Sequence, residues 1–64
     1  MRPEKIRSLL IENKVKQVEI ARELNVSSGA VNRVIDRHFV SHRIREAIAA
    51  KVRVPFKKMW GSAA

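Results

Sequence analysis

Apolar residues recur along the chain at intervals of three and four, the spacing that places side chains on one face of an α-helix. Five segments show this pattern. Their apolar positions are, in chain order, Ile6, Leu9 and Leu10; Ile20, Ala21 and Leu24; Val31, Val34 and Ile35; Ile44, Ala47, Ile48 and Val52; and Phe56, Met59 and Trp60. Two glycines and two prolines are too few for a fold of many short strands. The pattern therefore predicts an all-α protein of five short helices.

Residues typical of helix ends mark the limits of these segments. The expected boundary residues are Pro3, Asn13 and Lys14 for the first helix; Gln17 and Asn25 for the second; Ser27 and Asp36 for the third; Ser41 for the fourth; and Pro55 and Gly61 for the fifth. Connections of roughly three to five residues favour one compact domain over residues 1–64. Helices this short are marginal alone, so packing between them must stabilise the fold.

Residues 17–36, QVEIARELNVSSGAVNRVID, fit two helices that cross steeply over a three-residue turn. In such a unit Ala21 must be small because the second helix passes close over it. Asn25 must accept a left-handed turn conformation, where glycine is the commonest residue. Neither helix interior contains proline. The positions that face the shared core are all apolar: Ile20, Leu24, Val26, Val31 and Val34.

This unit resembles the helix-turn-helix of the lambda-repressor-like regulators, which are compact five-helix DNA-binding domains. The resemblance covers essentially the whole chain. Residues 41–60, SHRIREAIAAKVRVPFKKMW, are similar to the last two helices of Ner-like phage regulators, with Met59 in place of the usual leucine. The resemblance implies a single helix-turn-helix DNA-binding domain whose partner is double-stranded DNA.

In that docking mode the third helix, at about 28–36, enters the major groove with its N-terminal part nearest the bases. Base contacts are then expected from the outward residues Ser28, Gly29, Asn32 and Arg33. Asn32 matches adenine, and Arg33 matches guanine or a phosphate. Ser28 is a short donor and acceptor, while Gly29 allows close approach of the backbone.

Phosphate contacts are expected around the same face. The resemblance assigns one to Gln17 at the start of the second helix, where exposed amides and the helix dipole also suit an anion. The remaining candidates lie on the flanking loops and caps: Lys14, Lys16, Arg37, His38, Ser41 and Arg43.

The charge balance agrees with a polyanionic partner. Fourteen Lys and Arg against six Asp and Glu leave a formal net charge of +8 at pH 7. Charge alone favours nucleic acid and an anionic membrane equally, but the apolar residues are already needed for the core. The apolar stretches are too short for a transmembrane span. With no cysteine and no secretory signal, the sequence is typical of a cytoplasmic protein.

The predicted function is therefore sequence-specific regulation of transcription, by a phage or prophage repressor that occupies an operator. Two alternatives stay open: an architectural or recombination-accessory DNA-binding protein, and a protein-interaction module of the antitoxin-like or anti-repressor kind. No enzyme and no cofactor are expected, because the six acids are scattered over helix surfaces. A weak homodimer formed on DNA is expected, since any dimer must use the helical domain itself.

Several other residues are expected to have structural roles. On exposed helix faces, Arg22 and Arg45 are expected to pair with Glu19 and Glu46. Two further lysines, Lys57 and Lys58, are expected on a solvated C-terminal face.

Two histidines and two aromatic residues are interpreted in the same way. His38 and His42 lie four apart but straddle the Ser41 cap without a third ligand nearby, so no metal site is expected. Phe56 and Trp60, at helical spacing, are expected in the core.

Overall fold

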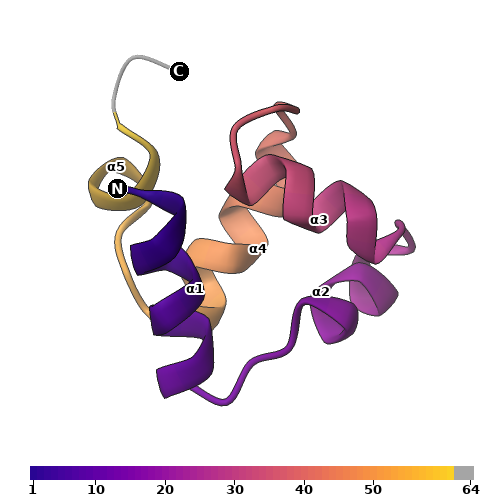
Figure 1. Cartoon of the computed structure of the whole chain (residues 1–64), viewed down its shortest axis with the longest axis horizontal. Helices are drawn as coiled ribbons and strands as arrows, with labels where there is room; N and C mark the ends of the chain where they lie inside the picture. The colour runs from indigo at the N-terminus through magenta and orange to yellow at the C-terminus, as the bar shows by residue number, and fades with distance from the viewer. Residues whose placement is uncertain (62–64) are drawn as a thin grey trace.

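The computed structural model describes residues 1–61, and within them it shows five helices and no strand. The helices are α1 (Pro3–Glu12), α2 (Gln17–Leu24), α3 (Ser28–Ile35), α4 (His42–Val52) and α5 (Phe56–Trp60) (Figure 1). The predicted all-α, five-helix class is confirmed. The third helix ends one residue before the predicted 28–36, because Asp36 is its C-cap residue. None of the helices in this part of the chain is both long enough and apolar enough to cross a membrane.

All five helices contribute to one core. Seven large side chains are fully buried: Ile6, Ile20, Val31, Val34, Ile35, Ile48 and Met59. Three of the seven belong to α3, so dense packing fixes the position of this helix in the domain.

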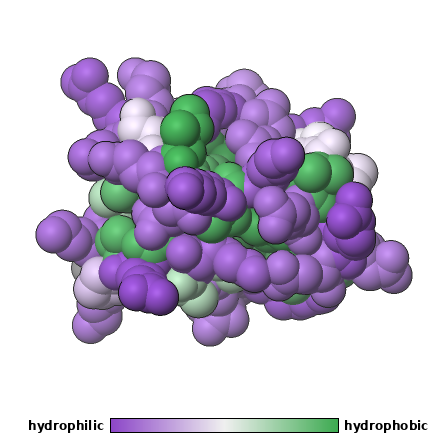
Figure 2. Space-filling view, turned by 90° about the horizontal axis from the view of Figure 1, so that it is seen from below, coloured by the Kyte–Doolittle hydropathy of each residue, from purple (hydrophilic) through white to green (hydrophobic). Residues whose placement is uncertain are grey.

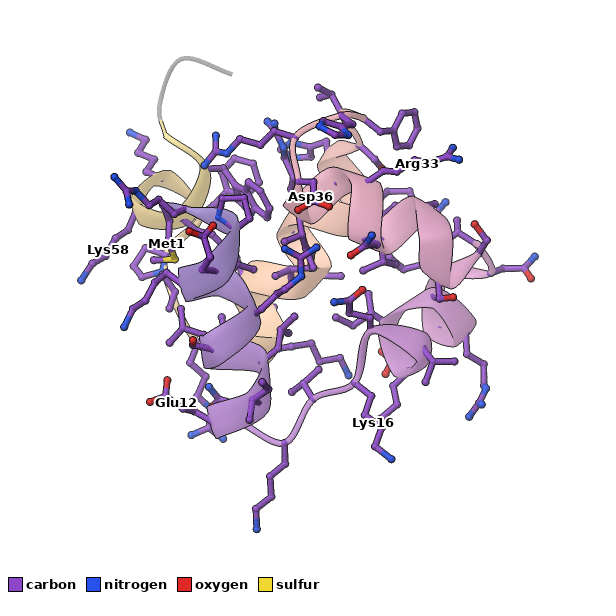
Figure 3. The ribbon with its side chains drawn as sticks, viewed as in Figure 1. Met1, Glu12, Lys16, Arg33, Asp36 and Lys58 are labelled. Atoms are coloured by element: carbon purple, nitrogen blue, oxygen red, sulfur yellow. The ribbon has the colours of Figure 1, made fainter. Side chains whose placement is uncertain are left out.

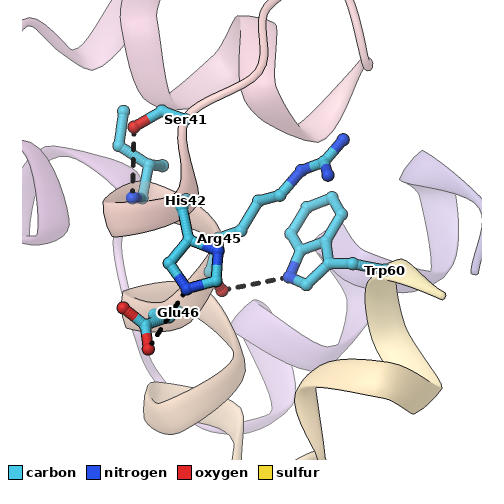
Figure 4. Close-up of polar contacts among 6 residues, drawn as sticks. Ser41, His42, Arg45, Glu46 and Trp60 are labelled. Atoms are coloured by element: carbon cyan, nitrogen blue, oxygen red, sulfur yellow. Dashed lines mark hydrogen bonds and ion pairs between the residues drawn. The ribbon is translucent and has the colours of Figure 1, made fainter. Parts of the chain in front are cut away.

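The predicted inner face of α4 packs against the core, but this helix buries one further residue that the sequence analysis did not single out. Ala47 is only half-buried, whereas Ala49 is buried. The reason is the placement of α5, which covers the flank of α4 that carries Arg45 and Ala49, one helical turn apart. The indole Nε1 of Trp60 donates a hydrogen bond to the Arg45 carbonyl oxygen at 3.0 Å (Figure 4).

Trp60 is buried, which confirms its predicted place in the core, and Phe56 is half-buried. The guanidinium of Arg45 lies over the Trp60 ring, 5.0 Å from its centroid. The expected pairing of Arg45 with Glu46 is therefore wrong, because the Arg45 side chain packs on Trp60 of α5 instead. Glu46 is paired instead with His42, 3.5 Å from Nε2 (Figure 4).

Helices α1 to α4 end in the same hydrogen-bonded turn. A residue one or two positions after the end of each helix has a positive φ: Lys14 at 56°, Asn25 at 58°, Arg37 at 64° and Arg53 at 57°. The next backbone amide then donates to a carbonyl five residues earlier, from Val15 to Leu10, Val26 to Ala21, His38 to Arg33 and Val54 to Ala49. In three of these turns the donor residue is a half-buried valine, but after α3 it is an exposed histidine. The segment that follows α3 is accordingly more exposed than the other connections.

Candidate nucleic-acid interface

The connection between α2 and α3 is short and closely determined. These two helices contact each other more extensively than any other pair, and residues 25–27 join them. Asn25 has the left-handed conformation predicted for it. Ser27 caps α3, as predicted, by accepting a hydrogen bond from the Ala30 amide at 3.1 Å. Val26 closes the turn with a 2.9 Å hydrogen bond from its amide to the carbonyl of Ala21, which is buried.

Helix α3 has one buried face and one exposed face. The four predicted base-contacting residues are all exposed on it: Ser28, Gly29, Asn32 and Arg33. Figure 3 shows Arg33 projecting away from the body of the molecule. At 100° per residue, Gly29, Asn32 and Arg33 point away from the buried face, while Ser28 is exposed because it is the first residue of the helix. The structure therefore brings the four candidates together on one solvent-facing surface.

Gly29 has no structural reason to lack a side chain. A Cβ at this position would meet only the Ser27 Oγ at 3.8 Å, an ordinary van der Waals contact. Its φ is also not positive, unlike that of Gly61. The fold would thus accept alanine here, and the glycine leaves the backbone of the first turn of α3 uncovered.

The structure adds a residue to this surface that the sequence did not single out. Arg7 of α1 reaches across to α3, where its Nη1 lies 2.9 Å from Asp36 Oδ1 and its Nη2 donates to Asn32 Oδ1 at 2.5 Å. The hydrogen bond from Arg7 lowers the pKa of the Asp36 carboxyl below its ordinary value. The same bond raises the pKa of the Arg7 guanidinium. Apolar periodicity contains no signal for this cluster, because it is formed by polar residues on two helices.

The start of α2 holds three of the predicted phosphate contacts. Gln17 is its first residue and is half-buried, while Lys14 and Lys16 are exposed on the preceding connection. Lys16 points outward in Figure 3. Its backbone amide donates to Glu19 Oε1 at 3.3 Å, so Glu19 caps the helix.

The expected ion pair between Arg22 and Glu19 is not formed within residues 1–61. The reason is that the Glu19 carboxylate turns back to the Lys16 amide at the start of the helix. Arg22 remains exposed.

Three other residues predicted to contact phosphates form hydrogen bonds within the protein. These are Arg37 Nη2 to the Met1 carbonyl at 2.6 Å, Arg43 Nη2 to the Leu24 carbonyl at 3.0 Å, and the Ile44 amide to Ser41 Oγ at 3.4 Å. Arg37 also lies over the Trp60 ring. A guanidinium has five N–H donors, so both arginines keep donors for a further acceptor. The last candidate, His38, is exposed.

The charge of the surface is largely uncompensated. Within residues 1–61, two cations form ion pairs with acids, Arg7 with Asp36 and Lys51 with Glu23 at 2.6 Å. The other Lys and Arg side chains form none there. Figure 2 shows hydrophilic side chains covering most of one face, with apolar side chains in separate spots. The net charge of +8 therefore creates a field that attracts polyanions.

No metal centre is assembled in the described part of the chain. His42 contacts Phe56, with ring centroids 5.0 Å apart, and pairs with Glu46. Within residues 1–61, no three His, Asp or Glu side chains lie close enough to hold a metal ion, and no pocket opens. The candidate site is an exposed surface of helices.

Comparison with protein-family models, with curated proteins and with solved structures found no match to this chain in any of the three. A function for the chain is therefore inferred from its residues and their geometry.

Proposed function

We propose that the chain binds double-stranded DNA with α3 in the major groove, and that it acts as a sequence-specific repressor of transcription. The observation that carries this proposal is the arrangement of α3. It is fixed by three fully buried residues and by a tight turn from α2, yet it exposes Ser28, Gly29, Asn32 and Arg33 together. An α-helix with its side chains is about 10–12 Å in diameter, which fits the width of the major groove, about 12 Å.

The flanking groups supply phosphate contacts on both sides of α3. Lys14, Lys16 and Gln17 lie at the start of α2, and His38 follows the end of α3. Contacts of this kind fix the register on DNA and contribute most of the salt-dependent affinity. Arg33, exposed and without an ion pair in residues 1–61, is the strongest candidate for a contact with guanine.

The size of the domain bears on how two copies would share a site. The domain measures 27 × 24 × 17 Å along its principal axes. Half-sites one helical turn apart are separated by about 34 Å, more than the longest extent of the domain, so adjacent copies would share at most a small contact. This supports the proposal of a weak homodimer formed on DNA. The proposal places the protein in the cytoplasm, acting on phage or prophage DNA.

The decisive experiment is selection of bound sequences from a pool of random duplexes at low salt. The wild-type protein is expected to enrich one half-site, and Asn32→Ala and Arg33→Ala are expected to lose that enrichment. Lys58→Ala is the matched control, because it removes the same charge as Arg33→Ala from an exposed position on α5. Figure 3 shows Lys58 and Arg33 on opposite sides of the molecule. This control should keep the half-site.

Other outcomes would separate the alternatives. Equal affinity for all duplexes with a steep salt dependence would favour an architectural or recombination-accessory protein. No binding to any duplex at low salt would reject DNA binding altogether and leave the protein-interaction module.

A further inference from the structure

We propose that Arg7 makes Asn32 a base reader that only donates hydrogen bonds, so that Asn32 selects guanine rather than adenine. The inference depends on the proposed DNA binding and specifies what that interface recognises. It changes the expectation from the sequence, in which Asn32 pairs with adenine.

The contact with Arg7 fixes which end of the Asn32 carboxamide is free. A guanidinium has N–H donors and no acceptor, so the Asn32 atom that faces Arg7 Nη2 at 2.5 Å must be the oxygen. The amide nitrogen lies on the other branch of the carboxamide. Because Asn32 is exposed, its two N–H groups are available to a partner.

The Arg7 guanidinium is held in place by contacts with two residues of α3. Asn32 and Asp36 lie four residues apart on α3, and the two terminal nitrogens of Arg7 contact one each, at 2.5 and 2.9 Å. This forked contact restricts the guanidinium more than a single hydrogen bond would. The side chains of Arg7 and Asp36 are 34% and 33% exposed, so solvent screens their pairing only in part. Ile6 and Leu10, on either side of Arg7 in the sequence, anchor α1 in the core.

The major-groove edges of the bases respond differently to such a side chain. Adenine presents an acceptor at N7 and a donor at N6, and asparagine pairs with both when its amide nitrogen donates and its oxygen accepts. Here Oδ1 already accepts from a cation, whose positive charge repels the N6 donor. Guanine presents two acceptors, N7 and O6, and both match the N–H groups of Asn32 Nδ2. The pairing with guanine satisfies both base acceptors, whereas in the pairing with adenine the second lone pair of Oδ1 must accept the N6 proton beside the positive guanidinium, which weakens that hydrogen bond.

Arg7→Lys is the sharpest test, because it keeps the charge while replacing the fork with a single ammonium group. The ammonium is expected to stay with the Asp36 carboxylate and to release Asn32 Oδ1. In selections from random duplexes, the wild-type protein should prefer guanine over adenine roughly tenfold at the position where Asn32→Ala abolishes discrimination. Arg7→Lys should bring that ratio to parity or reverse it, with other positions unchanged.

Arg7→Met is the second variant, since it removes every donor while keeping a long helical side chain. It should shift the same position toward adenine, provided that circular dichroism shows it folded at the assay temperature. Lys5→Met removes an equal charge from an exposed position of α1 and should weaken binding without changing the base ratio. If Arg7→Lys and Arg7→Met both bind DNA with the wild-type preference, or if the wild type prefers adenine, the role of Arg7 is refuted while DNA binding stands. If the wild type binds no duplex, the proposed function fails and this inference fails with it.

Discussion

Replacing Gly29 with alanine is expected to raise the stability of the protein and, if it binds DNA as proposed, to lower its affinity for DNA. The added methyl group finds space, because its nearest neighbour would be the Ser27 Oγ at 3.8 Å. Alanine loses less backbone entropy than glycine on folding and gains about 1 kcal/mol in a helix interior. At the second position of α3 we expect about half of this, about 0.5 kcal/mol. For a domain of this size that gain raises the melting temperature by about 2–4 °C.

The effect on binding has the opposite sign because of where the methyl group points. Gly29 lies in the first turn of α3 and on its exposed face, which would lie closest to the bases in the proposed DNA complex. A methyl group there would hold the backbone away from the groove and lengthen the neighbouring contacts of Ser28 and Asn32. We expect roughly tenfold weaker binding, equivalent to about 1.4 kcal/mol.

Thermal melting followed by circular dichroism and titration of the selected half-site measure the two effects on one protein. Gly61→Ala is the matched control, since it adds the same methyl group after α5, where φ is +89°. That variant should lose about 1 kcal/mol of stability from backbone strain and bind DNA as the wild type does. A lower melting temperature for Gly29→Ala would refute the packing argument. Unchanged or tighter binding would refute the close approach of the α3 backbone to DNA.

Three further predictions concern the fold that carries the interface. Ser27→Ala should lower the free energy of unfolding by about 1 kcal/mol, because the Ala30 amide loses its cap; an unchanged urea midpoint would contradict this. Ile48→Ala should lower the free energy of unfolding by about 2–5 kcal/mol, a large part of the stability of so small a domain, and should reduce the helical circular dichroism signal at 25 °C. Full helicity in dilute buffer with an unchanged urea midpoint would show that the core tolerates the cavity. The lowered pKa of Asp36 means that its ion pair stabilises the fold above the ordinary carboxyl pKa, about 3.9, and that this contribution is lost as the pH falls toward the folded-state value. Urea midpoints between pH 2 and 5 should therefore decline less for Asp36→Asn than for the wild type, and parallel curves would exclude the linkage.

Helix positions and the α2–α3 turn could be predicted from the sequence because each depends on neighbouring residues. Apolar spacing determines which side of a helix is buried, and Asn25 and Ser27 have local conformational preferences that suit a turn and a cap. The left-handed residues Lys14, Arg37 and Arg53 gave no such signal. Their side chains do not favour this conformation, which is imposed by the hydrogen bonds that close each helix.

Contacts between helices could not be predicted in the same way. Arg7 and Asn32 are 25 residues apart, and nothing in the spacing of either helix indicates that they meet. Arg45 was expected to pair with an acidic side chain, but the position of α5 places the Trp60 ring against its guanidinium instead. Both cases depend on how the helices pack, and polar residues at their edges follow that packing rather than determine it.

The left-handed helix ends have a consequence for engineering. For a residue with a Cβ this conformation costs roughly 1 kcal/mol, a cost that glycine avoids. At Arg37 the contacts with Met1 and Trp60 offset it, but Lys14 and Arg53 make no side-chain hydrogen bond within residues 1–61. At these two positions, substitution by glycine is therefore expected to stabilise the protein at the cost of a surface charge. Glycine at both positions is expected to raise the stability of the domain and to remove two cations, and a loss of DNA affinity would measure what these two charges contribute to the proposed binding.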